Sequence, residues 1–302
     1  MAKLISADLT NNKLCILEYT TIGGQMLSFK EDAFDAKIVS HTYTDIGKVI
    51  FDKPMTRIEE CAFFWCSSLT NVTIPDSVTT IGDYAFSSCK SLTSVTIPDS
   101  VTTIGRAAFS CCDSLKEFKG KFAADGGRCL IVDGVLNAFA LDCGATQYTI
   151  PDSVTTIGEV AFADCDSLTS VTIGNGVTTI GDCAFWCCNS LASVTIGNGV
   201  TTIGDSAFNG CTKLTSLTIP NSVTTIGEKA FSGCTSLTSV TIGKGVSEIG
   251  KEAFKGCNID TIVCCPEVPP KINDSFDRFE NLIVPTGCEE AYANSDWGQY
   301  LE

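Results

Sequence analysis

The chain has 302 residues, of which 44% are apolar and 18% charged, and its mean hydropathy is +0.21. This apolar content excludes an intrinsically disordered chain, and no run approaches the ~18–20 apolar residues of a membrane-spanning helix. The 35 acidic residues outnumber the 20 Lys and Arg, and the net charge of −15 argues against nucleic-acid and membrane-surface partners, because both are anionic.

Residues 1–45 are predicted to form an N-terminal β cap. The segments 13–20 and 37–43 alternate like strands, and Gly23-Gly24 reads as a turn. The first nine residues carry one basic residue and no apolar stretch of signal-peptide length. Two explanations fit, an intracellular protein or a mature fragment with a new start, so the compartment stays open.

Ten units of about 23 residues follow over 46–281; they start near residues 46, 69, 92, 115, 145, 168, 191, 214, 237 and 259. In each unit Leu-Thr-Ser-Val-Thr-Ile predicts a half-buried strand, and Pro-Asp-Ser or Gly-Asn-Gly predicts a corner. A short Val-Thr-Thr-Ile strand comes next, then a helical turn that opens with an acidic residue and ends in Ala-Phe and Cys. One unit cannot bury its apolar side alone, so the sequence predicts an α/β solenoid.

The fourth unit, 115–144, is seven residues too long. Asp133-Gly134 between two apolar runs predicts a β-hairpin that replaces or extends the helical turn. The hairpin is either a contact point or a tolerated insertion on the side of the solenoid.

Residues 282–302 are predicted to close the other end of the solenoid. The segment 282–284 reads as a last strand, and Thr286 with Glu289 has the spacing of a capping box that begins a short helix. Trp297 and Tyr300 are expected to cover the last unit by packing.

Residues 92–112, from Leu92 to Cys112, resemble the Treponema/BspA-like class of bacterial leucine-rich repeats, whose unit reads Leu-x-x-Ile-x-Leu-Pro-x-x-Leu-x-x-Ile-Gly-x-x-Ala-Phe-x-x-Cys. The match covers roughly 46–281, and the segment 283–292 looks like the ends of such proteins in gut Bacteroidales. The resemblance implies a right-handed leucine-rich-repeat coil and, for the family, cell-surface adhesion or binding of host matrix and plasma proteins. It implies no catalytic residues, and the absence of a recognisable signal sequence leaves the surface location open.

Eight of the 18 cysteines share one repeat position and are predicted to form a ladder; they are Cys66, Cys89, Cys112, Cys165, Cys188, Cys211, Cys234 and Cys257. Parallel Cβ vectors at a spacing of ~4.8 Å suit a disulfide poorly, so reduced, buried thiols that bond weakly to loop backbone are expected. Such thiols fit a reducing compartment or an anaerobic habitat.

The sequence gives little support for a metal site or a catalytic site. Cys183, Cys187 and Cys188 lie within one turn, but the chain has no Cys-x-x-Cys and a single histidine, so packing is preferred to zinc. That histidine, His41, is expected to be exposed on a cap strand and not to activate a nucleophile. The carboxylates recur as lattice elements, so no acid–base pair is expected. Calcium-binding β-rolls need a recurrent Asp, whereas Asn175, Asn198 and Asn221 at the corners are neutral, so neither calcium nor another cofactor is expected.

Departures from the repeat are the candidate binding residues. Phe64, Trp65 and Trp186 stand in a turn where other units carry Ser, Ala, Asp, Asn or Lys, and an exposed aromatic there is a candidate anchor. Packing by the cap is an equal alternative for Trp65. The outward strand residues are small, Ser170, Thr172, Ser193 and Thr195 among them, and read as a solvated β-face.

Three functions remain. We favour a non-enzymatic protein that binds a protein or glycan, with adhesion to host molecules as one form of it. The alternative is an intracellular scaffold, which the thiols support, and an enzyme with an unrecognised site comes last.

Overall fold

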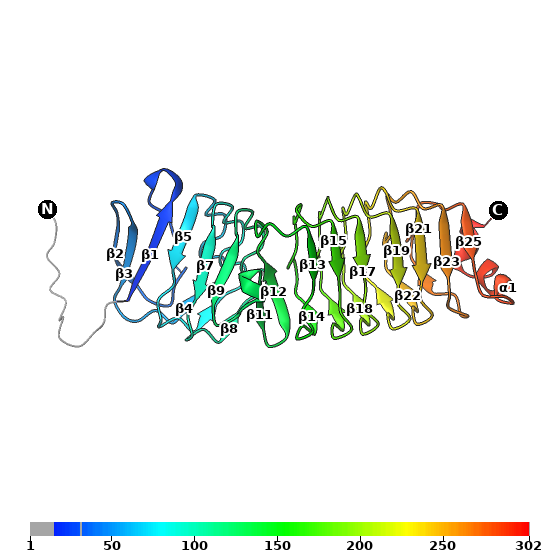
Figure 1. Ribbon diagram of the computed structural model, residues 1–302, viewed down its shortest axis with the longest axis horizontal. Helices are drawn as coiled ribbons and strands as arrows, with labels where there is room; N and C mark the ends of the chain where they lie inside the picture. The colour runs from blue at the N-terminus through cyan, green and yellow to red at the C-terminus, as the bar shows by residue number, and fades with distance from the viewer. Residues whose placement is uncertain (1–14, 31, 302) are drawn as a thin grey trace. The chain divides into compact units, whose positions relative to one another are not determined.

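The computed structural model describes residues 15–30 and 32–301 (Figure 1). These residues form two compact units, and the division lies between Ala123 and Ala124. The N-terminal unit holds two sheets. The first has the strand order β2-β3-β1-β5-β7-β9, with β1 Ile16–Thr21, β2 Ile38–Tyr43, β3 Gly47–Phe51, β5 Leu69–Thr73, β7 Ser94–Ile97 and β9 Glu117–Gly120. The second has the order β4-β6-β8, with β4 Arg57–Ile58, β6 Thr80–Ile81 and β8 Thr103–Ile104, and a short 3-10 turn, η1 Ile22–Gly24, follows β1.

The C-terminal unit holds three sheets. The longest runs from β10 to β24, with β10 Ala123–Ala124 at the unit boundary, β11 Cys129–Val132, β12 Val135–Phe139, β14 Thr156–Ile157, β16 Thr179–Ile180, β18 Thr202–Ile203, β20 Thr225–Ile226, β22 Glu248–Ile249 and β24 Lys271–Ile272. The others are β13 Gln147–Thr149, β15 Ser170–Thr172 and β17 Ser193–Thr195, then β19 Ser216–Ile219, β21 Ser239–Ile242, β23 Thr261–Cys264 and β25 Asn281–Ile283. The helical pieces are η2 Asp125–Gly127, α1 Glu289–Ala293 and η3 Asp296–Tyr300.

The repeat strands pair in parallel and in register. Thr179 lies opposite Thr202, and Val171 opposite Val194, in each case the residue 23 positions further on. Val and Ile of the strands point inward, as the pattern of exposed and buried residues in Ser216–Ile219 illustrates. The predicted solenoid of 23-residue leucine-rich-repeat coils is therefore confirmed within each unit.

The predicted helical turn after each Thr-Thr-Ile-Gly is wrong. The segment is a series of turns in which backbone N–H groups donate alternately to the next coil and to their own coil. The Phe185 N–H donates to the Ala207 carbonyl of the next coil at 2.7 Å, whereas the Trp186 N–H donates to the Cys183 carbonyl of its own coil at 3.0 Å. A helix would keep these N–H groups within its own segment. Hydrogen bonding to the next coil therefore replaces helix formation.

The acidic residue at the start of this turn has a different role from the one predicted. Asp182 Oδ1 accepts from the Asp205 N–H at 2.9 Å, and Asp205 Oδ1 accepts from the Glu228 N–H at 2.7 Å. The carboxylate thus links two coils by a hydrogen bond, and it does not stabilise the start of a helix as predicted.

The glycine before each turn is required by close approach of the preceding coil. A Cβ on Gly204 would lie 2.5 Å from Asp182 Oδ1 and 2.8 Å from the Asp182 nitrogen. A Cβ on Gly227 would lie 2.6 Å from the Asp205 nitrogen. No side chain fits at these positions without displacing backbone.

Phenylalanine rings stack along the interior of each unit. In the C-terminal unit the rings of Phe162 and Phe185 are 4.7 Å apart, and those of Phe208 and Phe231 are 5.2 Å apart and tilted by only 3°. All four rings are fully buried. One aromatic side chain per coil therefore forms a continuous column in the core.

A β-hairpin occupies the long unit. β11 and β12 are antiparallel, and Asp133 and Gly134 connect them with φ values of +49° and +79°. β12 then pairs in parallel with β14, and Phe139 stacks on Phe162 at 4.8 Å. The second hairpin strand thus takes the place of a coil strand and leads directly into the phenylalanine column.

Antiparallel strands begin the described part of the N-terminal unit. β3 pairs with both β1 and β2, although it lies inside the segment 46–281 that was assigned to repeats. Residues 1–14, with the start of the strand expected at 13–20, lie outside the described residues. The boundaries of the caps stay predictions.

The C-terminal segment packs on the last coil. β25 pairs with β23, the buried Trp297 donates from Nε1 to the Pro270 carbonyl at 2.9 Å, and the Tyr300 hydroxyl donates to the Phe276 carbonyl at 3.1 Å. The predicted capping box is wrong, because helix α1 starts after Cys288 and no side chain caps it. Within residues 15–30 and 32–301, no helix has the length and apolar character needed to cross a membrane.

Candidate binding surface

Phe64 and Trp65 lie in the first complete turn segment of the N-terminal unit. Phe64 is 44% exposed and Trp65 is 65% exposed, and their ring centroids are 6.2 Å apart. The Trp65 N–H donates to the Ser87 carbonyl of the next coil at 3.0 Å, which fixes the backbone that carries the ring. Trp65 is thus an exposed aromatic side chain on a hydrogen-bonded backbone.

Trp186 occupies the corresponding turn of the C-terminal unit and is 40% exposed. Its carbonyl accepts from the Asp164 N–H of the preceding coil at 2.8 Å. Phe64 shares this repeat position, and the remaining coils carry small or polar residues there, namely Ser87, Ser110, Ala163, Asn209, Ser232 and Lys255. A large exposed aromatic is therefore a local departure in an otherwise uniform turn.

Carboxylates surround the turn of Trp186. Burial, followed by the negative charges of Asp164 and Asp166, raises the pKa of the Cys187 thiol. Burial, followed by the charge of Asp182, also raises the pKa of Cys183. The potential around this turn is therefore negative.

The strand residues Ser170, Thr172, Ser193 and Thr195 form a regular polar face. Ser170 is half-buried and the other three are exposed, and β15 and β17 bring Ser170 opposite Ser193 and Thr172 opposite Thr195. The inward neighbour Val171 is buried. These positions offer hydroxyl groups without a large side chain.

The eight ladder cysteines lie along the interior edge of the coils. Seven are buried, and Cys66, the first, is half-buried. Cys211 Sγ donates to the Phe185 carbonyl at 3.3 Å, and Cys234 Sγ to the Phe208 carbonyl at the same distance. Each such thiol thus links its coil to the preceding one through the phenylalanine that ends the turn.

Burial favours the protonated form of several ladder thiols. Burial raises the pKa of Cys66 to about 11 and that of Cys165 to about 12, and it raises those of Cys89 and Cys112 further. None of the 18 cysteines, all of which lie within the described residues, forms a disulfide. Packing and hydrogen bonding account for the ladder.

No metal centre is found in the described part of the chain, where no three His, Cys, Asp or Glu side chains are grouped to hold an ion. The expectation that His41 is exposed is wrong, since its ring is half-buried. Nε2 lies 2.6 Å from the Tyr19 hydroxyl, the ring packs 5.2 Å from Phe29, and burial lowers the His41 pKa. His41 therefore belongs to an aromatic cluster.

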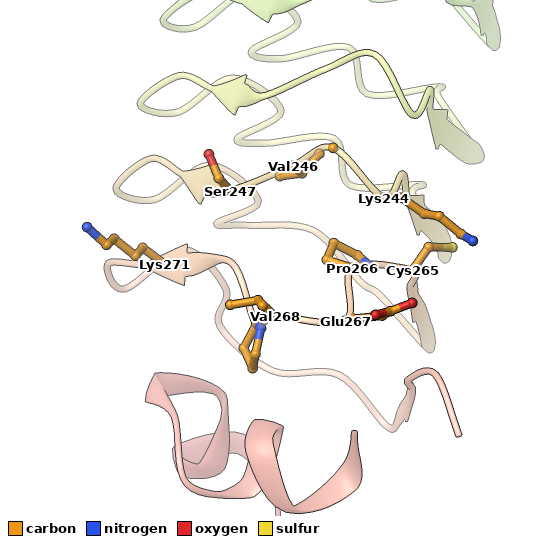
Figure 2. Close-up of a pocket in the computed structure, with 10 residues that line it drawn as sticks. Lys244, Val246, Ser247, Cys265, Pro266, Glu267, Val268 and Lys271 are labelled. Carbon is orange, nitrogen blue, oxygen red and sulfur yellow. The ribbon is translucent and has the colours of Figure 1, made fainter. Parts of the chain in front are cut away.

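A groove of about 510 Å³ was missed by the sequence analysis. Figure 2 shows Lys244 and Lys271 at its opposite ends, with Val246 on one side and Pro266 and Val268 on the other. The Cys265 N–H donates to the Ile242 carbonyl of the preceding coil, and the next backbone N–H that does so is that of Lys271, which donates to the Ser247 carbonyl. The prolines at 266, 269 and 270, which have no N–H to donate, were the available signal.

Comparisons with known proteins agree with this architecture. The model of the BspA-type leucine-rich-repeat region matches residues 36–122 and 136–281 in six copies. A leucine-rich cell surface protein of Faecalibacterium prausnitzii is 26% identical, with a TM-score of 0.59 over 80% of this chain and 73% of that one. The pneumococcal vaccine antigen PcpA, 20% identical, has a TM-score of 0.60 over 80% of this chain and 68% of its own, which shows a common fold.

A search of curated protein sequences gave no match. The family model nevertheless covers well over half of the chain, and the matched ranges contain the parallel repeat strands of both units. The chain therefore belongs to the BspA-type leucine-rich-repeat family.

Proposed function

We propose that this protein is a non-enzymatic binding protein that recognises a protein partner through exposed aromatic side chains of its turn segments. The observation that carries the proposal is the exposure of Trp65 and Trp186 at positions where most coils have small or polar residues. Tryptophan dominates the energetics of protein interfaces, because it buries a large area with few rotatable bonds.

The regular surface of a solenoid supports this use, since stacked repeats commonly serve macromolecular recognition. The Faecalibacterium relative is named as a cell surface protein, which supports adhesion as the form that binding takes. The strand face with Ser170, Thr172, Ser193 and Thr195 is a second candidate contact, better suited by its hydroxyl groups to a glycan or the rim of an interface.

The test is a binding screen of the whole chain against immobilised matrix proteins, plasma proteins and glycans. The parent is compared with Trp65→Ser, Trp186→Ser and the double variant, because serine occurs naturally at the matching positions 88 and 232. We expect at least one protein ligand whose retention falls about tenfold or more in one of the variants. Thr172→Arg with Thr195→Arg tests the strand face.

Binding that survives all of these substitutions would contradict the proposal. Circular dichroism and the thermal midpoint of each variant show whether the fold is kept. An intracellular scaffold is the second candidate, and the observation that favours it is the set of 18 thiols without a disulfide. A partner bound only under reducing conditions would support the scaffold.

A further inference from the structure

We propose that Trp186 and the carboxylates around it dock a lysine- or arginine-bearing segment of a partner protein. This inference rests on the proposed function and adds the chemistry of the ligand at one of its two aromatic positions. The charge distribution, the placement of the carboxylates and the exposure of the ring support it.

The stretch of coils that includes the Trp186 turn is acidic and has no basic residue. Residues 129–212 contain eight acidic residues and no Lys, Arg or His. Residues 46–128, which include Trp65, contain nine acidic and nine basic residues, and residues 213–278 contain seven of each. More than half of the net charge of −15 therefore lies in the segment that carries Trp186.

The coil geometry places several of these carboxylates next to the Trp186 turn. Asp164 donates its N–H to the Trp186 carbonyl, and Asp166 Oδ1 accepts from the Asn189 N–H at 3.2 Å. On the other side, the Asp205 N–H donates to Asp182 Oδ1, four residues before Trp186. The preceding coil, the turn itself and the following coil thus each contribute negative charge.

The pKa directions of the neighbouring thiols agree with this placement. Besides burial and Asp182, the charges of Glu159 and Asp205 contribute to the raised pKa of Cys183, three residues before the ring. Asp164 and Asp166 contribute to that of Cys187, the residue after it. The negative field therefore acts on both sides of Trp186.

An exposed indole on a turn that is flanked by acidic residues suits a cationic side chain. The ring face attracts a guanidinium or ammonium group, and a carboxylate beside it accepts hydrogen bonds from the same group. The same charges repel acidic partners. Later coils lose the ring, which Asn209, Ser232 and Lys255 replace. They also lack an acidic residue at the repeat positions of Asp164 and Asp166, so the combination is confined to one coil.

The test uses a synthetic peptide of alternating arginine and glycine, with a matched peptide in which neutral citrulline replaces every arginine. Binding to the whole chain is measured by calorimetry and by tryptophan fluorescence at low and moderate salt. We expect the arginine peptide to bind and the citrulline peptide to fail. Trp186→Ser should weaken binding about tenfold, and Met26→Ser, which removes an exposed apolar side chain from the other unit, should leave it unchanged.

A second pair of variants separates a local site from general attraction to an acidic protein. Asp164→Asn with Asp166→Asn should weaken peptide binding, whereas Asp76→Asn with Asp99→Asn, which removes the same charge at two exposed corners, should not. Asparagine keeps the backbone hydrogen bond of Asp166 and tolerates the left-handed backbone of Asp164, whose φ is +60°.

The proposal would be overturned if the two asparagine pairs lost the same affinity for the arginine peptide, or if Trp186→Ser lost none. Calcium chloride alone is the other probe. A calcium signal that disappears in Asp164→Asn with Asp166→Asn, without any peptide binding, would identify the site as one for an ion and overturn it too. If Trp186→Ser weakens retention of a protein with no basic segment, this inference fails while the proposed function stands.

Discussion

Two halves of the C-terminal unit share one interior and differ at their turns. In both 129–212 and 213–278 the stacked phenylalanine rings lie 4.7–5.2 Å apart. The first half, however, has eight acidic residues and no base, while the second is balanced with seven of each. Stacking fixes the residues that face inward, whereas the turn positions can change without altering the coil.

The earlier and later turns of this unit also differ in backbone strain. Asp164 and Cys187 have φ values of +60° and +53°, whereas Gly210, Gly233 and Gly256 occupy the matching position of the later coils. A left-handed residue with a side chain costs roughly 1–2 kcal/mol, which glycine avoids. The turns of Asp164 and Cys187 therefore keep a side chain at this position at a cost in stability, and glycine replaces it from Gly210 onward.

The largest expected effect is a fall in stability with rising pH, caused by the buried thiols of the interior that both halves share. The pKa values of Cys165 and Cys264 are raised by burial to about 12, and those of Cys188 and Cys234 are well above the usual value, through hydrogen bonds with Cys211 and Cys257 and through burial. Unfolded thiols ionise from about pH 8.5 while these four stay protonated in the fold, so stability is kept below that pH and falls above it.

The free energy of unfolding should fall by about 1.4 kcal/mol per thiol for each pH unit between ~9 and ~12. For the four thiols together the fall should be about 5 kcal/mol per pH unit. Urea unfolding at pH 7, 9 and 10 in reducing buffer measures it. Since each half holds two of these thiols, both halves should lose stability together. A midpoint that stays constant from pH 8 to 10 would contradict this prediction, and Cys188→Ala should reduce the slope by one thiol.

An intermediate effect is expected from glycine substitutions in the balanced half. Gly227→Ala would place a Cβ 2.6 Å from the Asp205 nitrogen, which should cost about 2 kcal/mol because backbone must move. Gly233→Ala, whose Cβ would lie 3.7 Å from the nearest atom, should cost only the ~1 kcal/mol of its left-handed backbone. Equal urea midpoints of the two variants would show that close approach does not explain the glycine.

The smallest effect is a gain in stability in the acidic half. Cys187→Gly should stabilise the chain by about 1 kcal/mol, because it relieves a positive φ and creates the residue found in three later coils. The measurement is the urea midpoint at pH 7. Cys211→Gly is the contrasting variant, since it removes a buried thiol that bonds to the Phe185 carbonyl and should destabilise. A lower urea midpoint for Cys187→Gly would show that the Cys187 thiol stabilises the fold by more than its left-handed backbone destabilises it.

The strands were predictable from the sequence because their period is set by burial, which the alternation of Val and Ile with Ser and Thr records. The turns after Gly181 and Gly204 were not, because Ala-Phe-rich segments suit a helix locally and the deciding N–H groups bond to the next coil. The exposure of Trp186 followed from its position in the repeat. The surrounding charge required the fold, since Asp164 and Asp182 belong to different coils.

The hydrogen bonds between coils join residues 22 to 26 positions apart, such as Phe208 with Ala230 and Cys234 with Phe208. Each coil therefore meets the same set of donors and acceptors whichever copy precedes it. Duplication or loss of a 23-residue segment inside 191–257 would rejoin matching surfaces, with neither a new interior nor a changed register. Copy number can thus vary through recombination among nearly identical segments, lengthening or shortening the array while the distinctive Trp186 coil persists.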